Sequence, residues 1–302
     1  MTFHRGVTLT TATTLGHADT SNLGPSAGNG FYKRWPDDLA LLQDLGVTDL
    51  RLTLDWARLQ PKPGDLDGDW SERFDNIVDA AAAIELRVWA TLYDGASPRW
   101  IDNEGGLADE DTVTTWWPRW VERVADRFGD RISGWIPFAA IPDSLPQQPW
   151  SDTWTVLDGG EAPVVAAVGH DRLDTIQRFL AEADRIGLAM STDVAPDHDP
   201  TEEELAAVGG QLGDALMRAA ELAEDIPLVV SEYSPHHTDP DVNGLLVGRF
   251  VDAVDAAIED GVDIGVCFLD PAIAGPDSPV GLLDKDRSPQ PAASAFLPPT
   301  PD

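Results

Sequence analysis

The sequence contains very little cysteine and no long hydrophobic run. One cysteine, Cys267, stands among 302 residues, so no disulfide can form within the chain. No stretch approaches the ~18 unbroken apolar residues of a membrane helix. The first residues lack the basic region and apolar run of a signal peptide. We therefore expect a cytoplasmic protein without a membrane segment, in which Cys267 is buried and unreactive.

Positive charge is also scarce. The chain has 20 Lys and Arg against 53 Asp and Glu, a net charge of −33, and only three of the basic residues are lysines. Such a surface repels phosphate backbones and anionic membranes, so we expect neither nucleic acid nor membrane as a partner. The acidic residues are spread along the chain, which predicts a solvated surface rather than a disordered tail. A high-salt cytoplasm and a GC-rich codon bias both produce this composition.

Strand-like and helix-like segments alternate along the whole chain. The predicted strands are 7–11, 49–54, 87–93, 132–138, 187–192, 226–231 and 262–269. The predicted helices are 35–45, 71–86, 109–128, 173–186, 202–224 and 244–259. Ser71 is a candidate N-cap, and Thr201 with Glu204 matches a capping box. This alternation predicts an α/β fold with a parallel sheet and right-handed crossovers.

The number of strands depends on residues 163–168. If they form a strand, the count is eight and residues 139–162 are a long connection with no clear helix. If they belong to a helix, the sheet has seven strands. No linker composition or internal repeat divides the chain, so we expect a single domain over residues 1–302 with a frayed C-terminal tail.

Three stretches carry a family likeness. Residues 35–61 contain Arg51, Trp56 and Arg58 on a helix–strand unit; residues 128–138 lead into Gly134-Trp-Ile-Pro-Phe; and residues 229–233 read Val-Val-Ser-Glu-Tyr. Together they resemble family 1 glycoside hydrolases, the β-glucosidase type, and residues 261–266 and 280–286 resemble the closing segments of that family. The resemblance implies a (β/α)₈ TIM-type barrel, shortened after its fourth strand, that hydrolyses O-glycosyl bonds without a cofactor.

The resemblance also identifies a missing catalytic group. Retaining glycosidases use two carboxyl groups ~5–5.5 Å apart, one as nucleophile and one as general acid and base. Glu232 matches the nucleophile of the family. Ala139-Ala140 stands where the family has Asn-Glu, and neither alanine can donate a proton. The chain therefore resembles a divergent member that lacks the acid/base glutamate.

Other sugar-holding positions differ from the family as well. Thr13 replaces a Gln, Asp94 replaces a His, and Leu269 followed by Asp270 replaces a Trp. Arg51 is retained, and its guanidinium is expected to pair with Glu232. Glu232 is thus either a catalytic or ligand-orienting carboxylate, or an inherited ion-pair partner of Arg51.

A replacement acid could come from three residues. Asp94 and Asp270 follow predicted strands, and Asp143 lies four residues past the missing Asn. Each is either an acid that takes over the proton transfer or an ordinary solvated loop residue. The pair His236-His237 could bind a metal with these carboxylates, but a loop pair without metal is the interpretation we adopt.

Aromatic residues supply the remaining candidates for substrate contacts. Trp56 and Trp100 are interpreted as either a pocket wall or core packing. Tyr93, which ends a predicted strand, and Tyr233, which follows Glu232, are further substrate-binding candidates. The set of Trp116, Trp117 and Trp120 has helical spacing and predicts packing of an outer helix against the barrel.

Three functions remain open from the sequence. The first is a divergent glycosidase that acts on β-O-glycosides with Glu232 as nucleophile and Arg51 as its electrostatic partner. The second is a catalytically inactive barrel that binds a glycoside-like small molecule or a protein partner. The third is a lyase or isomerase in which Asp94, Glu232 and Asp270 act as acid and base. No pattern in the sequence defines an oligomeric state.

Overall fold

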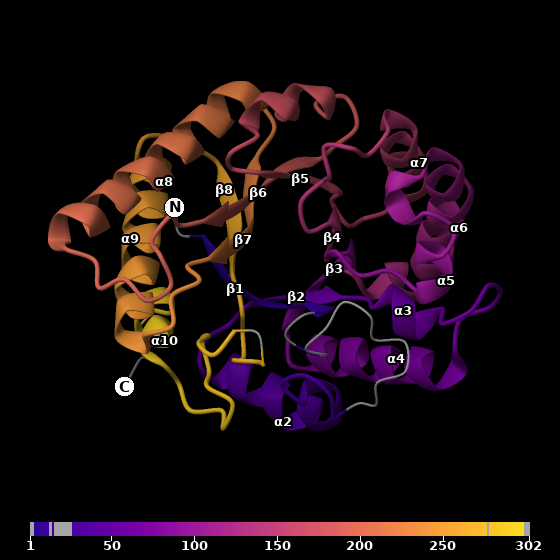
Figure 1. Cartoon of the computed structure of the whole chain (residues 1–302), viewed down its shortest axis with the longest axis horizontal. Helices are drawn as coiled ribbons and strands as arrows, with labels where there is room; N and C mark the ends of the chain where they lie inside the picture. Colours follow the sequence, from indigo (N-terminus) through magenta and orange to yellow (C-terminus); the bar gives the residue numbers. More distant parts are fainter. Residues whose placement is uncertain (1–2, 12–13, 15–25, 277, 299–302) are drawn as a thin grey trace.

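The computed structural model describes residues 3–11, 14, 26–276 and 278–298. These residues form eight parallel strands in one nearly closed barrel, with helices outside it (Figure 1). The strands are β1 (His4–Leu9), β2 (Asp49–Thr53), β3 (Arg87–Tyr93), β4 (Gly134–Phe138), β5 (Val165–Gly169), β6 (Arg185–Ser191), β7 (Leu228–Ser234) and β8 (Ile264–Leu269). The predicted (β/α)₈ fold is confirmed, and residues 163–168 supply the eighth strand.

A seam separates β4 from β5. The strand order is β4-β3-β2-β1-β8-β7-β6-β5, so these two strands are the edges that meet. They share an isolated bridge between Trp135 and Val164, with hydrogen bonds from the Trp135 amide to the Pro163 carbonyl (2.8 Å) and from Ile141 to Ala167 (2.8 Å). Proline at position 137, in the middle of β4, has no amide hydrogen to donate. The ladder is therefore interrupted where Pro137 would otherwise pair with β5.

Two large aromatic rings fill part of the barrel interior. Trp89 and Phe268 meet edge to face with ring centroids 5.8 Å apart. They occupy space left by glycines on neighbouring strands: a Cβ atom at Gly134 would lie 2.1 Å from the Trp89 ring, and one at Gly6 would lie 2.4 Å from the Phe268 ring. The Trp89 indole also donates to Asp49 (2.8 Å). This alternation of large and small residues packs the interior beneath the functional end of the barrel.

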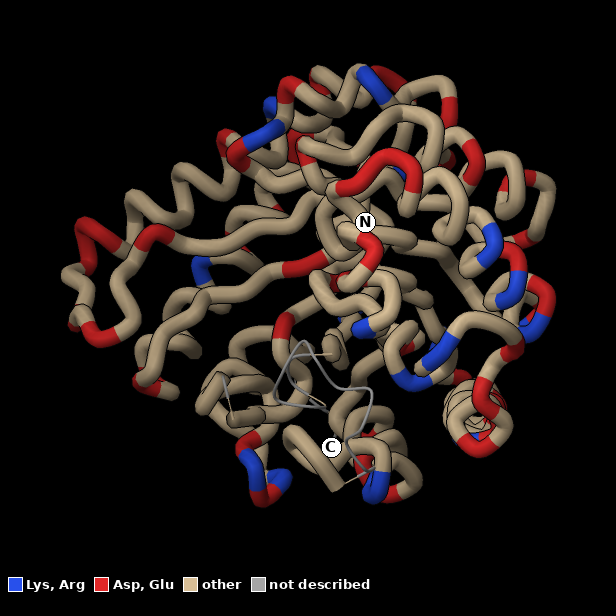
Figure 2. Tube along the Cα trace, turned by 45° about the vertical axis from the view of Figure 1, so that its right-hand side comes forward, with Lys and Arg blue, Asp and Glu red and all other residues tan. Residues whose placement is uncertain are grey.

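The helices cover the outside of the sheet. They are α2 (Phe31–Asp44), α3 (Trp56–Leu59), α4 (Gly68–Ala83), α5 (Arg99–Asp102), α6 (Glu110–Phe128), α7 (Gln147–Leu157), α8 (Glu202–Ala223), α9 (Pro240–Glu259) and α10 (Pro291–Phe296). In Figure 1, α8, α9 and α10 lie on the side of β7 and β8, whereas α6 and α7 lie on the side of β3 and β4. Figure 2 shows Asp and Glu on many of the helices and loops.

Several helix boundaries differ from the sequence-based expectation. The predicted helix 173–186 is wrong: the chain forms a 3₁₀ helix, Leu173–Arg178, and then enters β6 at Arg185. Asp184 accepts a hydrogen bond from the Val164 amide (2.9 Å), which holds the chain at the start of β6 and leaves no room for further helical turns. Ser71 is also not the N-cap, because helix α4 begins a turn earlier with Asp67 accepting from the Trp70 amide (3.0 Å).

The segment 139–162 contains a helix that the pattern did not predict. Helix α7 buries Trp150, Thr153 and Leu157, which are spaced by three and four residues. The Trp150 indole donates to the Glu182 carbonyl (3.1 Å), so a tertiary contact anchors the helix. Elsewhere, the capping box of Thr201 and Glu204 at α8 is confirmed, and Cys267 is buried. None of the described helices has both the length and the apolar character required to span a bilayer.

Candidate active site at the carboxyl ends of the strands

Glu232 enters the barrel because β7 carries an extra residue. Val230 of β7 pairs with Cys267 of β8, and Tyr233 pairs with Leu269, so three steps along β7 match two steps along β8. On the other side, Val229 and Glu232 of β7 pair with Gly187 and Ala189 of β6, again three steps against two. Such a bulge reverses the inward and outward alternation of side chains. As a result Glu232 faces the barrel mouth, with 23% of its side chain exposed, while the Tyr233 ring lies against helix α9.

Arg51 crosses the interior to reach Glu232. Its side chain is fully buried, and Nη1 lies 2.8 Å from Oε2 of Glu232 and 2.7 Å from the Ser231 carbonyl oxygen. Its Nε donates to the Thr91 hydroxyl (2.9 Å) on β3. These contacts fix the guanidinium from two sides and hold it against the Glu232 carboxyl group. The predicted pairing of Arg51 with Glu232 is present in the structure.

Asp94 follows β3 and points back toward β1 and β2. Its Oδ2 accepts hydrogen bonds from the Thr11 amide (2.6 Å) and the Thr53 hydroxyl (2.9 Å), while Oδ1 is buried without a hydrogen-bond donor. Burial raises the pKa of Asp94, and the hydrogen bonds from Thr11 and Thr53 and the charge of Arg51 oppose that rise. One oxygen of the Asp94 carboxyl group is therefore held by hydrogen bonds, and the other has no hydrogen-bond donor among the described residues.

Asp270 follows β8 and stands beside β7. The Ser234 hydroxyl donates to its Oδ2 (2.9 Å), and its Oδ1 is buried without a donor. Burial, reinforced by the nearby Glu232 carboxylate, raises the pKa of Asp270 to about 8. A hydrogen bond from Ser234 and the charge of Arg51 oppose this rise but do not cancel it. The raised pKa of Asp270 favours its protonated form at neutral pH.

The interior beside these carboxyl groups contains further polar atoms without partners. Nη2 of Arg51 and the hydroxyls of Thr8 and Ser231 are buried and have no hydrogen-bond partner among the described residues. All three residues are fully buried. Buried polar groups left unpaired are costly, so their grouping at one end of a barrel indicates a place for bound polar atoms. The site can hold a hydroxylated ligand beside the carboxyl groups of Glu232 and Asp270.

The two residues that directly follow β4 have no carboxyl group. Ala139 and Ala140 follow β4, and the Ala139 amide donates to the Tyr93 carbonyl (2.9 Å). Asp143 is half-exposed and forms an ion pair with Arg172 on the segment after β5. The structure brings Asp94, Asp270, Arg51 and Glu232 together and leaves Asp143 outside this group.

The aromatic candidates lie in separate environments, and Tyr93 packs edge to face on Trp117 of helix α6 (ring centroids 6.5 Å apart). Tyr93 ends β3 and lines a pocket of about 380 Å³. Trp56 is buried and stacks on Trp120 with centroids 5.3 Å apart, so the structure favours core packing for it. Trp100 donates to the Gln60 carbonyl (2.9 Å), away from Glu232.

Tyr233 and Thr13 do not add contacts to the site. The Tyr233 hydroxyl donates to the Leu246 carbonyl (3.1 Å) and its ring stacks on Phe250 with centroids 4.2 Å apart, so it faces helix α9. Burial raises the pKa of Tyr233. Thr13 lies outside the residues that the structure describes. Trp117 and Trp120 of helix α6 are buried, which agrees with the predicted packing of that helix.

The histidine pair after β7 has structural contacts. His237 is buried, and its ring contacts the His198 carbonyl (2.7 Å) through Nε2 and the Asp239 amide (3.1 Å) through Nδ1. Both ring nitrogens are therefore occupied. Within the described part of the chain, no group of three or more His, Cys, Asp or Glu is placed to hold a metal ion.

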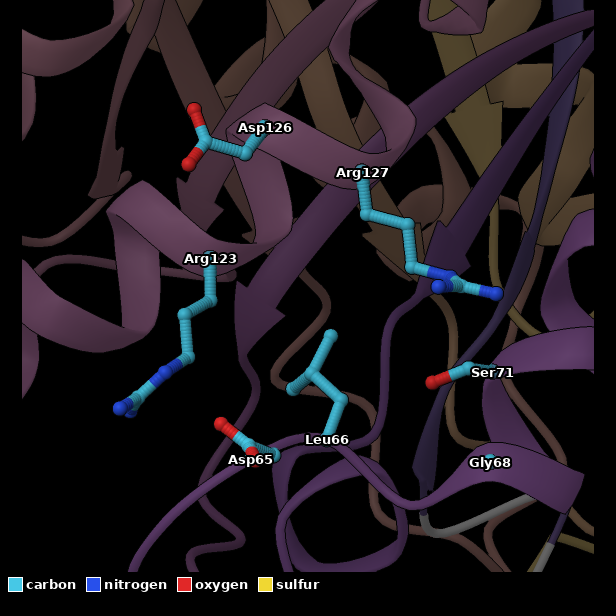
Figure 3. A pocket seen from close by; sticks show the side chains of 7 residues that line it. All are labelled: Asp65, Leu66, Gly68, Ser71, Arg123, Asp126 and Arg127. Carbon is cyan, nitrogen blue, oxygen red and sulfur yellow. The ribbon is translucent and has the colours of Figure 1, made fainter.

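A second pocket, between helices α4 and α6, lies in the outer layer. It has a volume of about 600 Å³, and Figure 3 shows Arg123 and Arg127 of α6 on one side with Asp65 and Ser71 on the other. Arg127 is paired with Asp75 (2.5 Å). Asp65 and Asp126 balance the two arginines in this pocket, so it has no net charge that would select an anion.

Sequence reasoning missed the small polar residues that hold the site. Thr53, Thr91, Ser231 and Ser234 contact Asp94, Arg51 or Asp270. A signal was present, because Arg51 and Thr53 alternate with apolar residues on β2, and buried strands of a barrel normally carry bulky apolar residues on their inward face. Polar residues at inward-facing positions of neighbouring strands would have predicted the residues that surround Arg51 and Asp94.

Comparison with known proteins finds similarity to one family over part of the chain. Residues 11–145 match the model of glycosyl hydrolase family 1. A β-glucosidase of Agrobacterium sp. is 29% identical over 192 residues, which cover 58% of this chain and 39% of that enzyme. β-Glucosidase A of Thermotoga maritima is 25% identical over 140 residues, covering 46% and 26% of the two chains. The resemblance to family 1 glycoside hydrolases is confirmed.

Solved structures of β-glycosidases have the same overall fold as this chain. The β-glucosidase from Thermotoga maritima in complex with deoxynojirimycin superposes with a TM-score of 0.72 at 13% identity, covering 97% of this chain and 96% of that chain. The β-glycosidase from Pyrococcus horikoshii gives a TM-score of 0.68 at 17% identity, covering 87% and 79%. These likenesses establish the fold. In sequence, the chain spans less than half the length of the two curated relatives named above.

Proposed function

We propose that this chain is a divergent family 1-type hydrolase of β-O-glycosides, with Glu232 as its nucleophile. The contact that carries the proposal is the 2.8 Å ion pair between Nη1 of Arg51 and Oε2 of Glu232. A buried guanidinium holds this carboxylate at the mouth of the barrel, where active sites of the fold lie. The confirmed resemblance to family 1 supports hydrolysis of a glycosidic bond as the reaction.

The two protonation states in the site suit this chemistry. Glu232 is paired with Arg51, whereas the pKa of Asp270 is raised to about 8, so Asp270 remains protonated at pH 7. Neighbouring carboxyl groups with separated protonation states are typical of glycosidase sites. Asp270 can donate a hydrogen bond to a sugar hydroxyl or to Glu232, while Nη2 of Arg51 and the Ser231 hydroxyl remain free to contact the sugar.

Asp94 is the carboxyl placed to exchange a proton with the leaving group. In the double displacement, the nucleophile and the departing oxygen lie on opposite faces of the anomeric carbon. Strand β3 lies four steps from β7 around the eight-stranded order, which is the far side of the mouth. Asp94, at the end of β3, has an uncommitted Oδ1 and a raised pKa. We assign it, and not Asp270, the proton exchange with the leaving oxygen and with water.

Covalent trapping tests the role of Glu232 directly. The wild-type protein would be incubated with 2,4-dinitrophenyl 2-deoxy-2-fluoro-β-D-glucoside and the corresponding galactoside, and digested for peptide mass spectrometry. We expect one fluorosugar on the peptide that carries Glu232. Glu232→Gln should not be labelled, and Asp143→Asn, which changes a carboxylate outside the site, should be labelled like the wild type. Labelling at another residue, or hydrolysis of aryl glycosides at the same rate by Glu232→Gln, would contradict the proposal.

One observation favours a second function, that of a catalytically inactive ligand-binding barrel. Ala139 and Ala140, which directly follow β4, have no carboxyl group that could act as the general acid. Buried polar atoms of Arg51, Thr8 and Ser231 have no hydrogen-bond partner among the described residues and could bind a polar ligand. A binding barrel would retain affinity for glycosides and show no trapped intermediate. The same trapping experiment, combined with calorimetric titration of methyl β-D-glucoside, separates the two functions.

A further inference from the structure

We propose that the pocket between helices α4 and α6 binds a neutral cyclic polyol, such as a sugar, at a site separate from the barrel mouth. The pocket has a volume of about 600 Å³, within the range of small-molecule sites. The described residues that line it come from the loop before α4 and from α4 and α6, and neither Glu232 nor Arg51 is among them. The inference therefore does not depend on the proposed function.

Ser71 has an unused hydroxyl group in this pocket. Asp67 caps helix α4 by accepting from the Trp70 amide (3.0 Å), so the Ser71 hydroxyl is not needed at the start of the helix. Only 2% of Ser71 is exposed, and its Oγ has no hydrogen-bond partner among the described residues. Figure 3 shows this hydroxyl pointing into the space between α4 and α6. Because a buried polar group without a partner is costly, the hydroxyl indicates a position for a bound polar atom.

Arg123 supplies a second group of the same kind. Its side chain extends from α6 toward the loop that carries Asp65 (Figure 3), and its Nη1 is buried with no hydrogen-bond partner among the described residues. The neighbouring Arg127 is instead paired with Asp75 (2.5 Å). A guanidinium nitrogen only donates hydrogen bonds, whereas a serine hydroxyl both donates and accepts. The ligand must therefore offer an acceptor to Arg123 and a donor or an acceptor to Ser71.

The other groups in the pocket select the chemical class of the ligand. Asp65 and Asp126 balance the two arginines, so neither an anion nor a cation gains a net attraction. The carboxylates need donors and the Arg123 guanidinium needs an acceptor, and hydroxyl groups provide both. Leu66 lies between Arg123 and Ser71 in Figure 3 and offers an apolar surface to the C–H face of a ring. These features together fit a neutral ring that carries several hydroxyl groups.

Binding can be measured by saturation-transfer NMR with three small probes. The probes are myo-inositol, which is neutral and has no glycosidic bond, acetate as an anion and methylammonium as a cation. We expect myo-inositol alone to bind in this pocket. Gly68→Phe places a ring in the pocket at a position where an added Cβ meets no atom within 4 Å, and it should abolish the myo-inositol signal. Gly210→Phe on α8, where an added Cβ also meets nothing, is the matched control and should retain the signal.

Arg123→Met removes the proposed donor and should weaken the binding of myo-inositol about tenfold or more, as loss of a hydrogen bond from a charged group does. Arg119→Met changes the same charge at an exposed position of the same helix, outside the pocket, and should bind like the wild type. Titration of each variant with myo-inositol gives the two dissociation constants. Equal weakening in both arginine variants would assign the effect to net charge and would contradict a site at Arg123.

Ser71→Ala distinguishes a ligand contact from a structural role. Because the hydroxyl has no partner among the described residues, its removal should leave the urea midpoint unchanged or raise it. The same variant should bind myo-inositol about fivefold more weakly, because one hydrogen bond to the ligand is lost. A lower urea midpoint together with unchanged affinity would show that Ser71 serves the fold and not a ligand.

The outcomes separate this pocket from the proposed function. Binding of myo-inositol that is lost in Gly68→Phe and kept in Glu232→Gln supports the pocket, whether or not a fluorosugar is trapped on Glu232. The pocket is overturned if myo-inositol gives no saturable signal, if its signal persists in Gly68→Phe, or if acetate or methylammonium binds there instead. Circular dichroism of the two glycine variants verifies that the fold is intact, because both positions are exposed.

Discussion

Nη1 of Arg51 lies 2.8 Å from Oε2 of Glu232, although the two residues are 181 positions apart in the sequence. Arg51 is fully buried, whereas 23% of the Glu232 side chain is exposed. Removing one partner of such a pair leaves a charge without compensation, which costs more than the pair itself contributes. The same ion pair therefore stabilises the folded barrel and fixes the position of Glu232 at its mouth.

Replacing Arg51 by methionine should lower the free energy of unfolding by about 3 kcal/mol, since Glu232 and the Ser231 carbonyl lose their common partner. The double variant Arg51→Met with Glu232→Gln should recover part of this loss, because the uncompensated carboxylate is gone. Urea denaturation measures both effects. Arg249→Met is the control: it removes an exposed ion pair with Glu202 and should cost less than about 1 kcal/mol. Equal losses in the two arginine variants would contradict the argument.

Replacing Asp94 by asparagine should affect substrates according to their leaving groups. If Asp94 exchanges the proton, kcat/KM for alkyl β-glycosides should fall by about 10²-fold. For 2,4-dinitrophenyl glycosides, whose leaving group needs no proton, formation of the glycosyl-enzyme should change little. Steady-state kinetics over a series of leaving groups measures the slope of rate against leaving-group pKa, which should become steeper. Asp252→Asn, at an exposed position on α9 outside the site, is the control and should leave the slope unchanged.

The stability of the protein should depend on pH through Asp270. Its folded-state pKa is about 8, above the ordinary aspartate value of 3.8, because of burial and the neighbouring Glu232. The folded state thus holds a proton that the unfolded chain releases near pH 4. This contribution to stability is complete below that pH and is lost as pH rises through 8.

Asp270→Asn should therefore gain stability relative to the wild type as pH rises from about 4 to about 8. Thermal unfolding at several pH values measures the difference in Tm between the two proteins. The exposed residue Asp252 on α9 provides the control, since its Asn variant should follow the wild type at every pH. A difference in Tm for Asp270→Asn that stays constant with pH would show that Asp270 is not protonated in the folded state.

The sequence predicted the parts of the fold that local chemistry determines. Strand β3 matches its expected range because it is a short, mostly apolar run. Helix α6 matches its range to within one residue because Asp109 caps its start and Gly129 follows its end. Helix α7 was missed because its eleven residues contain proline, serine and threonine, which have low helix propensity, and its stability comes from burying Trp150 and Leu157. Tertiary packing, and not propensity, decides such a segment.

The candidate site was predicted in its residues but not in its arrangement. Arg51, Glu232, Asp94 and Asp270 followed from the family resemblance, and the structure groups them. The raised pKa of Asp270 could not be predicted from the sequence. It depends on burial and on the nearby Glu232, which the pairing of β7 with β8 brings close. The inward position of Glu232 also depends on a bulge whose register only the paired strands β6 and β8 define.

The interior packing beneath the site gives a last test, based on two glycines in strands. Gly134→Ala places a Cβ atom 2.1 Å from the Trp89 ring, which is already held by Asp49, so the ring or the strand must shift. We expect a loss of about 1–3 kcal/mol in the free energy of unfolding. Gly265→Ala on β8 is the matched control, because nothing lies within 4 Å of its added Cβ, and it should be neutral or slightly stabilising. Urea denaturation compares the two variants, and near-ultraviolet circular dichroism follows the environment of Trp89. If Gly134→Ala were as stable as Gly265→Ala, the close packing of Trp89 on β4 would not be a feature of the folded barrel.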